Sequence, residues 1–203
     1  MNEPLDILNH CMVIVGENPV SSYDSRHPTA ISARQVIERL DKQLQKRGWW
    51  YNKERNVLLS PNPMGEVILP SDTLDVKALR PNGFLVRRNG RLYDPYNHTY
   101  VIDKDVHVDI TLQLPVEDLP NEAFDFLMAK SAFEFFCSLD GDGKSIQYLN
   151  LQTERDRAEY DLKRVDLREK KNNSQLRPVS LLLKMRLQAG YTFNPVYPGG
   201  RPV

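Results

Sequence analysis

The residues of this chain that are able to do chemistry are few and scattered. Asp105, His107 and Asp109 alternate along one face of an apolar segment, and their imidazole and carboxylates would suit a metal ion or a polarised water. The solvent face of an antiparallel strand normally shows the same alternation, so we interpret the trio as strand polarity. The other three histidines have no partner at a ligand spacing.

Signatures of nucleophilic and phosphate chemistry are also missing from the sequence. There is no GxSxG motif, and Cys11 and Cys137 lie in apolar periodic stretches without CxxC or Cys/His spacing. The glycine-containing segment 140–144 fits neither a P-loop nor an EF-hand, and we expect it to be a turn between helices. The sequence therefore predicts no catalytic residue, no metal and no cofactor, with both cysteines reduced and buried.

Glycoside hydrolysis stays open as an alternative, because it requires only two carboxylates about 5–10 Å apart in a cleft. The chain has 27 acidic residues, so some pair will always qualify. The aromatic cluster at 49–51 is able to stack on a sugar, but such clusters more often bury a junction between a helix and a sheet. We expect that second, structural role.

The charge balance bears on the class of partner. The 203 residues include 27 Lys and Arg against 27 Asp and Glu, a net charge of zero and a length typical of one domain with an appendage. DNA binding through bulk positive charge needs clustered cations, so a DNA-binding module is the weakest hypothesis. No apolar run approaches 18 residues and no signal peptide begins the chain, so we expect no membrane contact and a product made in the cytoplasm.

Hydrophobic periodicity predicts an α+β fold, with a helical bundle body, a β-rich insertion and an extended C-terminal arm. Apolar residues recur at helical spacing over 4–15 and 28–47, and again over 123–139 and in a long charged segment from 145 to 171. Strict alternation over 106–114 predicts a half-buried strand. Arg88-Asn89-Gly90 predicts a hairpin turn, and Asn172–Ser174 is expected to end the last helix. These boundaries give a body of residues 1–48 and 116–172, an insertion of 49–115 and an arm of 173–203.

Two sets of apolar residues are candidate contacts with other chains. The long charged helix has one narrow apolar seam, which suits packing against a copy of itself. We predict a subunit interface at Leu151, Ala158, Leu162 and Val165. The arm is too apolar for a free tail and holds four prolines, so we predict that it lies on another chain through Leu181, Leu183, Leu187, Tyr191, Phe193 and Tyr197.

Five motifs in this order and spacing resemble the tail tubular protein A family, the head-to-tail adaptors of autographivirus-type short-tailed phages. The resemblance covers residues 4–171. It is carried by Leu5–Asn9 with Ile14–Val20, Arg47–Trp49 with Asn52, Arg91–Asp94, Asn97–Tyr100, and Glu117–Pro120 leading into a Phe-rich helix that holds Lys130-Ser131-Ala132.

The resemblance implies a structural role in the virion tail. Members of this family form a twelve-subunit ring between the portal and the tail nozzle, which is of the tail tubular protein B type, around the channel that DNA crosses. It implies no cofactor and no sequence-specific DNA binding. Hydrolase residues proposed for relatives find no motif here, so a virion-associated glycoside hydrolase remains only the alternative.

Overall fold

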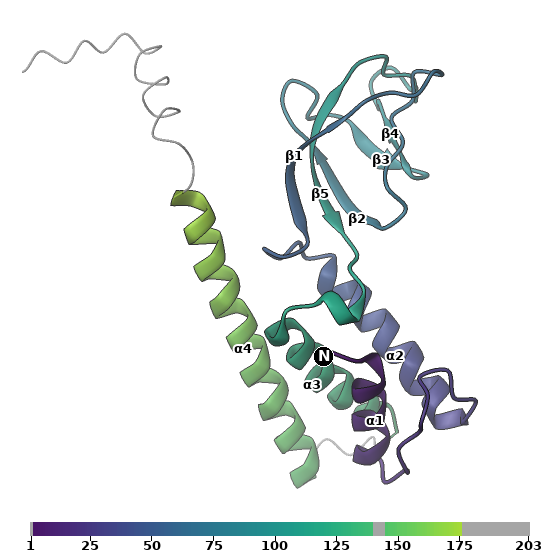
Figure 1. Cartoon of the computed structure of the whole chain (residues 1–203), viewed down its shortest axis with the longest axis vertical. Helices are drawn as coiled ribbons and strands as arrows, with labels where there is room; N and C mark the ends of the chain where they lie inside the picture. Colours follow the sequence, from purple (N-terminus) through teal and green to yellow (C-terminus); the bar gives the residue numbers. More distant parts are fainter. Residues whose placement is uncertain (1, 140–144, 176–203) are drawn as a thin grey trace, which may run out of the picture. The chain divides into compact units, whose positions relative to one another are not determined.

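The computed structural model describes residues 2–139 and 145–175. The chain divides into two compact units, Met1–Asp166 and Leu167–Val203, and all contacts discussed below lie within the first. Its elements confirm the α+β class. Figure 1 shows α1, α2 and α3 gathered at one end of this unit and the strands at the other.

Three helices make the body of the first unit. They are α1 (Pro4–Ile14), α2 (Pro28–Gln45) and α3 (Asn121–Leu139). Proline occupies the start of α1 and α2, where its missing N–H costs nothing. The apolar residues predicted for α2 are all buried and share one core with α1 and α3: Ala30, Ala33, Ile37, Leu40 and Leu44.

The fourth helix, α4 (Ile146–Gln175), is longer than predicted. Asn172–Ser174 was expected to end the helix, and the structure shows helix through these residues. Asparagine and serine have only weakly unfavourable helix propensities, unlike proline, so a helix that is already formed can extend across them. The first three residues of the predicted arm therefore belong to α4, and the predicted contact residues between Leu181 and Tyr197 lie outside the described residues.

The β-rich region consists of a three-stranded antiparallel sheet and a short hairpin. The sheet has the order β1–β5–β2, formed by β1 (Lys53–Leu59), β5 (Val106–Leu112) and β2 (Thr73–Ala78). The hairpin joins β3 (Val86–Arg88) to β4 (Arg91–Tyr93) through Asn89 and Gly90, which both have positive φ. The predicted turn is confirmed, because Asn-Gly tolerates that conformation at little cost.

The predicted alternating strand is confirmed as β5. Val106, Val108 and Ile110 are buried in a second core that belongs to the β-rich region, whereas His107 on the opposite face is exposed. Beyond Leu112 the chain leaves the sheet and runs through a 3₁₀ turn, η1 (Val116–Asp118), into α3.

Candidate assembly surfaces

The apolar seam of α4 faces the chain's own core. Leu162 is fully buried in the main core with α1, α2 and α3, and Ala158 packs against the same core. Leu151 is buried against Ala132 and Phe136 of α3, and Val165 is 7% exposed. The prediction that this seam is a subunit interface is therefore wrong. A narrow stripe on a charged helix has the same appearance whether its partner is a neighbour or the rest of the chain.

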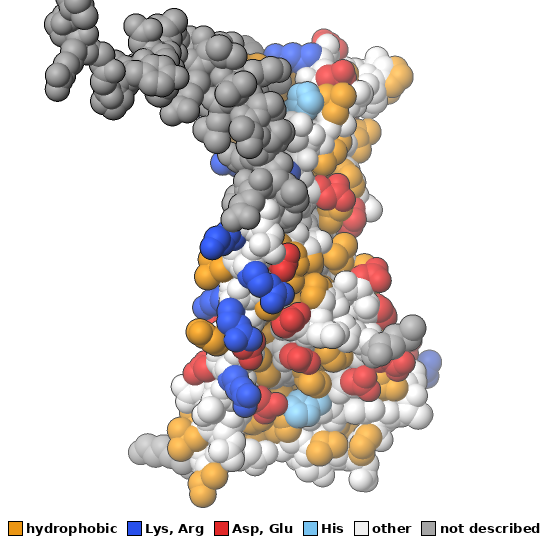
Figure 2. Space-filling model, turned by 60° about the vertical axis from the view of Figure 1, so that its left-hand side comes forward, with side chains coloured by type: hydrophobic (Ala, Val, Ile, Leu, Met, Phe, Trp, Pro, Cys, Tyr) orange, Lys and Arg blue, Asp and Glu red, His pale blue; other side chains and the backbone are white. Residues whose placement is uncertain are grey.

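The opposite face of α4 carries apolar side chains in solvent. Ile146, Leu149 and Tyr160 are 79%, 54% and 66% exposed. At 3.6 residues per turn these three positions share one side of the helix, turned away from the buried seam. Lys/Arg and Asp/Glu side chains are interspersed along the same helix (Figure 2). Ile146 and Leu149 lie about one turn apart, and Tyr160 lies about three turns further along the same side. Contiguous exposed apolar groups rimmed by charged residues are typical of a protein contact site.

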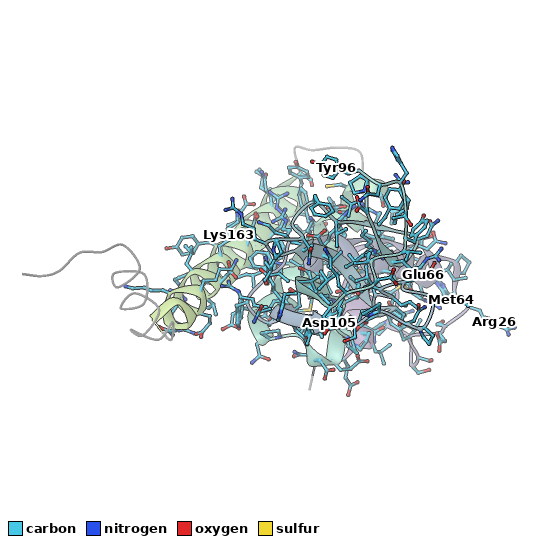
Figure 3. All side chains as sticks on the ribbon, turned by 90° about the horizontal axis from the view of Figure 1, so that it is seen from above. Arg26, Met64, Glu66, Tyr96, Asp105 and Lys163 are labelled. Carbon is cyan, nitrogen blue, oxygen red and sulfur yellow. The ribbon has the colours of Figure 1, made fainter. Side chains whose placement is uncertain are left out.

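Ion pairs tie one flank of α4 to the end of α2. Glu159 lies 2.7 Å from the ammonium of Lys163, which is labelled in Figure 3, and 3.5 Å from the guanidinium of Arg47. The hydrogen bond from Lys163, together with the charges of Lys163 and Arg47, lowers the pKa of the Glu159 carboxyl. This flank is already paired within the chain.

A groove of about 430 Å³ separates the first half of α3 from α4. Glu122 and Asp125 line it from α3, and Glu154 and Asp161 line it from α4. Partial burial, followed by the nearby charge of Glu122, raises the pKa of the Asp125 carboxyl. Arg157 and Arg164 also line the groove. A carboxyl with a raised pKa beside other carboxylates resembles the acid pair of a glycoside hydrolase.

A buried polar network joins the helical body to the β-rich region. The side-chain amide of Gln45 pairs with both backbone groups of Leu114: its Nε2 donates to the carbonyl and its Oε1 accepts from the N–H, each at 2.8 Å. Asn52 Nδ2 donates to the carbonyls of Gln45 and Leu112, also at 2.8 Å. The Gln45 and Asn52 side chains are buried and their bonds are buried or partly buried, so the network holds the end of α2 to the end of β5.

Asp41 completes this network from α2. Its carboxylate accepts from Gln45 Nε2 at 2.8 Å and from Gln113 Nε2 at 3.1 Å. Burial nevertheless raises the pKa of the Asp41 carboxyl, and these two hydrogen bonds only partly oppose the rise. The sequence reasoning missed the network, because Asp41, Gln45 and Gln113 look like ordinary surface residues until the fold encloses them.

The aromatic cluster at 49–51 lies beside the network. Trp49 is buried and its Nε1 donates to the Leu44 carbonyl at 2.8 Å, while Trp50 and Tyr51 stack edge to face. Burial, and then the charges of Asp41 and Asp166, raise the pKa of Tyr51. The cluster therefore fills the junction between helix and sheet, as predicted, and it is not presented as a sugar platform.

The histidine and acidic residues of β5 and the buried cysteine do not form a catalytic or metal site in the part of the chain that the structure describes. Asp109 accepts a hydrogen bond from the Asn56 backbone N–H at 3.1 Å, and His107 lies exposed on β5. Within residues 2–139 and 145–175 no three His, Cys, Asp or Glu side chains gather as a metal site. Burial raises the pKa of the Cys11 thiol to about 12, so that cysteine stays a protonated core residue.

Comparison with known proteins decides the family. Residues 5–175 match the family described as Tube, tail tubular protein. The chain belongs to the tail tubular protein family. Tail tubular protein A of Klebsiella phage KP34 is 29% identical to it over 146 residues, which cover 71% of this chain and 77% of that protein. This tail tubular protein is thus a structural component of a phage virion tail. In the part of the chain that the structure describes, no helix is long and apolar enough to cross a bilayer.

The motifs that carry the family resemblance hold this tail tubular protein's fold together. Asn52 Oδ1 accepts from the Trp49 N–H at 2.9 Å and so closes the turn after α2. Asp94 accepts from the backbone N–H groups of Tyr96 and Asn97 at 2.8 and 3.1 Å. Leu119 is buried before α3. These roles explain why the motifs are recognisable although they contain no catalytic signature.

Proposed function

We propose that this tail tubular protein forms a homo-oligomeric ring, of twelve subunits as the family resemblance implies, between the portal and the tail nozzle. The ring would leave a conduit through which DNA passes during ejection. The observation that carries the proposal is the exposed apolar face of α4 at Ile146, Leu149 and Tyr160 on a chain that belongs to this family. Side chains of this kind gain stability when another chain covers them.

The charge of the chain supports a conduit. Equal numbers of acidic and basic residues let identical subunits crowd together without net repulsion. A channel in which DNA slides should not bind phosphates in series, and a basic tract that would do so is missing from the sequence.

The ring is tested with purified protein by analytical ultracentrifugation and negative-stain electron microscopy. We expect wild-type rings, and loss of rings with a folded monomer when Leu149→Asp and Tyr160→Asp are combined. Glu54→Lys together with Asp75→Lys, at exposed positions on the sheet, is the matched control and should assemble normally. A double variant on α4 that assembles like wild type would contradict the α4 contact.

The part of the predicted arm that follows α4, residues 176–203, is proposed to bind the portal or a ring neighbour. The apolar side chains available for this contact are Leu181, Leu183, Leu187, Tyr191, Phe193 and Tyr197. Deletion of residues 178–203 should leave rings that no longer attach to portal-bearing heads. Normal attachment of the truncated ring would refute this contact.

The groove between α3 and α4 is the reason to keep a second candidate, a virion-associated glycoside hydrolase. The raised pKa of Asp125 is the feature that favours it. We expect no release of reducing sugar from host polysaccharide by the pure protein. Turnover that Asp125→Asn abolishes and Asp75→Asn leaves unchanged would establish the enzyme and overturn the purely structural role.

A further inference from the structure

A pocket of about 240 Å³ between the C-terminal end of α2 and the strands gathers three basic side chains. Lys42 and Lys46 line it from α2, and Arg87 lines it from β3. None of the three is in an ion pair within the part of the chain that the structure describes. Asp72 is the one acidic side chain in the lining, so the pocket has a net positive charge.

The pocket also holds a hydrogen-bond donor with nothing to bind. Thr73 lines it and is 3% exposed, and its Oγ1 has no hydrogen-bond partner among the described residues. Arg87 Nη1 donates to the Leu74 carbonyl at 2.9 Å, which positions the guanidinium at the pocket. Converging ammonium, guanidinium and hydroxyl donors favour an oxyanion.

The form of the site favours a protein carboxylate over DNA. Phosphates of a duplex run in rows along a convex surface and are bound by rows of cations. Here the cations converge on one concave pocket, and Asp72 would repel the phosphates next to any that entered. A short carboxylate-bearing turn can enter a concave pocket without bringing a row of further anions past Asp72, and the three cations outnumber that one carboxylate.

The same chain carries two adjacent carboxylates that lack partners. Glu117 and Asp118 lie in the turn η1, and both are exposed. Across residues 2–139 and 145–175 neither side chain has a hydrogen bond or an ion pair. The next residue, Leu119, is buried, and its carbonyl accepts from Asn2 Nδ2 at 2.7 Å, so the turn is held in place.

We propose that the pocket of Lys42, Lys46 and Arg87 in one copy binds the carboxylates of Glu117 and Asp118 in the next copy around the ring. The inference rests on the proposed ring. A ring is built from two different surfaces that meet head to tail, and a basic pocket with an acidic turn is such a pair. Because the pocket is concave, solvent and salt screen the contact less than an exposed ion pair.

A charge swap tests the proposal. Lys42→Glu with Lys46→Glu makes the pocket acidic, and Glu117→Lys with Asp118→Lys makes the turn basic. Each double variant alone should lose at least nine-tenths of its rings in ultracentrifugation. An equimolar mixture should recover them, since every contact then joins opposite charges in alternating subunits. Lys77→Glu with Arg80→Glu, exposed and outside the pocket, is the control and should assemble as wild type.

The outcomes separate this inference from the proposed function. Wild-type protein that never assembles refutes the ring and the contact together. Wild-type rings with unimpaired rings from either double variant refute the contact alone. A mixture that stays unassembled, although circular dichroism shows both variants folded, also refutes the pairing. If a charge-reversed variant does not fold, the neutral variant Lys42→Gln with Lys46→Gln replaces it. This variant should reduce ring formation at least threefold at 0.15 M salt. Unchanged ring formation by this variant would refute the contact.

Discussion

The helical region and the β-rich region each have a hydrophobic core, and the two cores are built from very different spans of sequence. The helical core brings together side chains as distant as Ile7 and Leu162. Among the residues that the structure describes, the core of the β-rich region draws only on those from Val57 to Leu112. The β-rich region is therefore local in sequence, whereas the helical core is complete only when α4 has packed.

This difference predicts how far the effect of a core substitution spreads in each region. A change in the β-rich core affects one contiguous segment, whose link to the helices is the network around Gln45 and Asn52. A substitution on the inner face of α4 removes packing from a core to which all four helices contribute side chains. The inner face of α4 is thus needed for the core, whereas its outer face lies in solvent, where we propose the contact with a neighbouring subunit.

The largest expected effect is that of Leu162→Asp. Leu162 is fully buried, and an unpaired carboxylate there adds charge burial to the loss of packing, so we expect more than about 4 kcal/mol of destabilisation. Tyr160→Asp, two residues away and 66% exposed, should change the free energy of unfolding by less than about 0.5 kcal/mol. Urea unfolding measures both, and a folded Leu162→Asp monomer would show that α4 does not close the core.

Gln45→Ala should weaken the link between the regions by about 2–3 kcal/mol. The change leaves the half-buried N–H and carbonyl of Leu114 without the side-chain partners they now have at 2.8 Å. Gln43→Ala, exposed on the same helix, is the control and should be nearly neutral. Hydrogen exchange at the Leu114 amide should accelerate in the first variant alone, and equal protection in both would argue against the network.

The helices were predictable because their apolar periodicity is strong. The register of α2 from Ala30 to Leu44, the alternation of β5 and the Asn-Gly turn are local signals, and the structure confirms them. The partner of the α4 seam was not predictable, because periodicity shows that Leu151 and Leu162 are covered but not by which chain.

The candidate contact surfaces were harder to predict than the fold. Lys42, Lys46 and Arg87 come together only after the strands fold back onto α2, and a cation in the last turn of a helix has an ordinary interpretation through the helix dipole. The one available signal was the repeat of lysine at positions four apart, which places like charges on one face.

Gly90→Ala should cost about 1 kcal/mol within the β-rich region. Gly90 has a φ of +69° with open space around its α-carbon, so the cost is backbone strain and not a clash. Gly83→Ala is the matched control, since its φ lies outside the left-handed region and an added Cβ would make an ordinary contact at 3.6 Å. Thermal unfolding that shifts equally in both variants would contradict this assignment.

The smallest expected effect is that of Glu159→Gln, at about 0.5 kcal/mol or less, because its partner Lys163 is 55% exposed and water screens the pair. The pKa of Glu159 is lower in the folded chain than in the unfolded chain, so its contribution is present at neutral pH and disappears as the pH falls through the folded value. Wild type and variant should therefore differ in urea unfolding at pH 7 and converge in acid. If the difference in the free energy of unfolding between wild type and variant grew in acid, the pKa of Glu159 would be raised by folding and not lowered.

The mass of the wild-type particle tests the central claim most directly. Native mass spectrometry of the purified full chain, checked by class averages from electron microscopy, reports whether 23.5 kDa subunits close into a ring. The proposal predicts one dominant species with twelve subunits and an open centre. Monomer as the only species at every concentration, with and without portal protein, would contradict it.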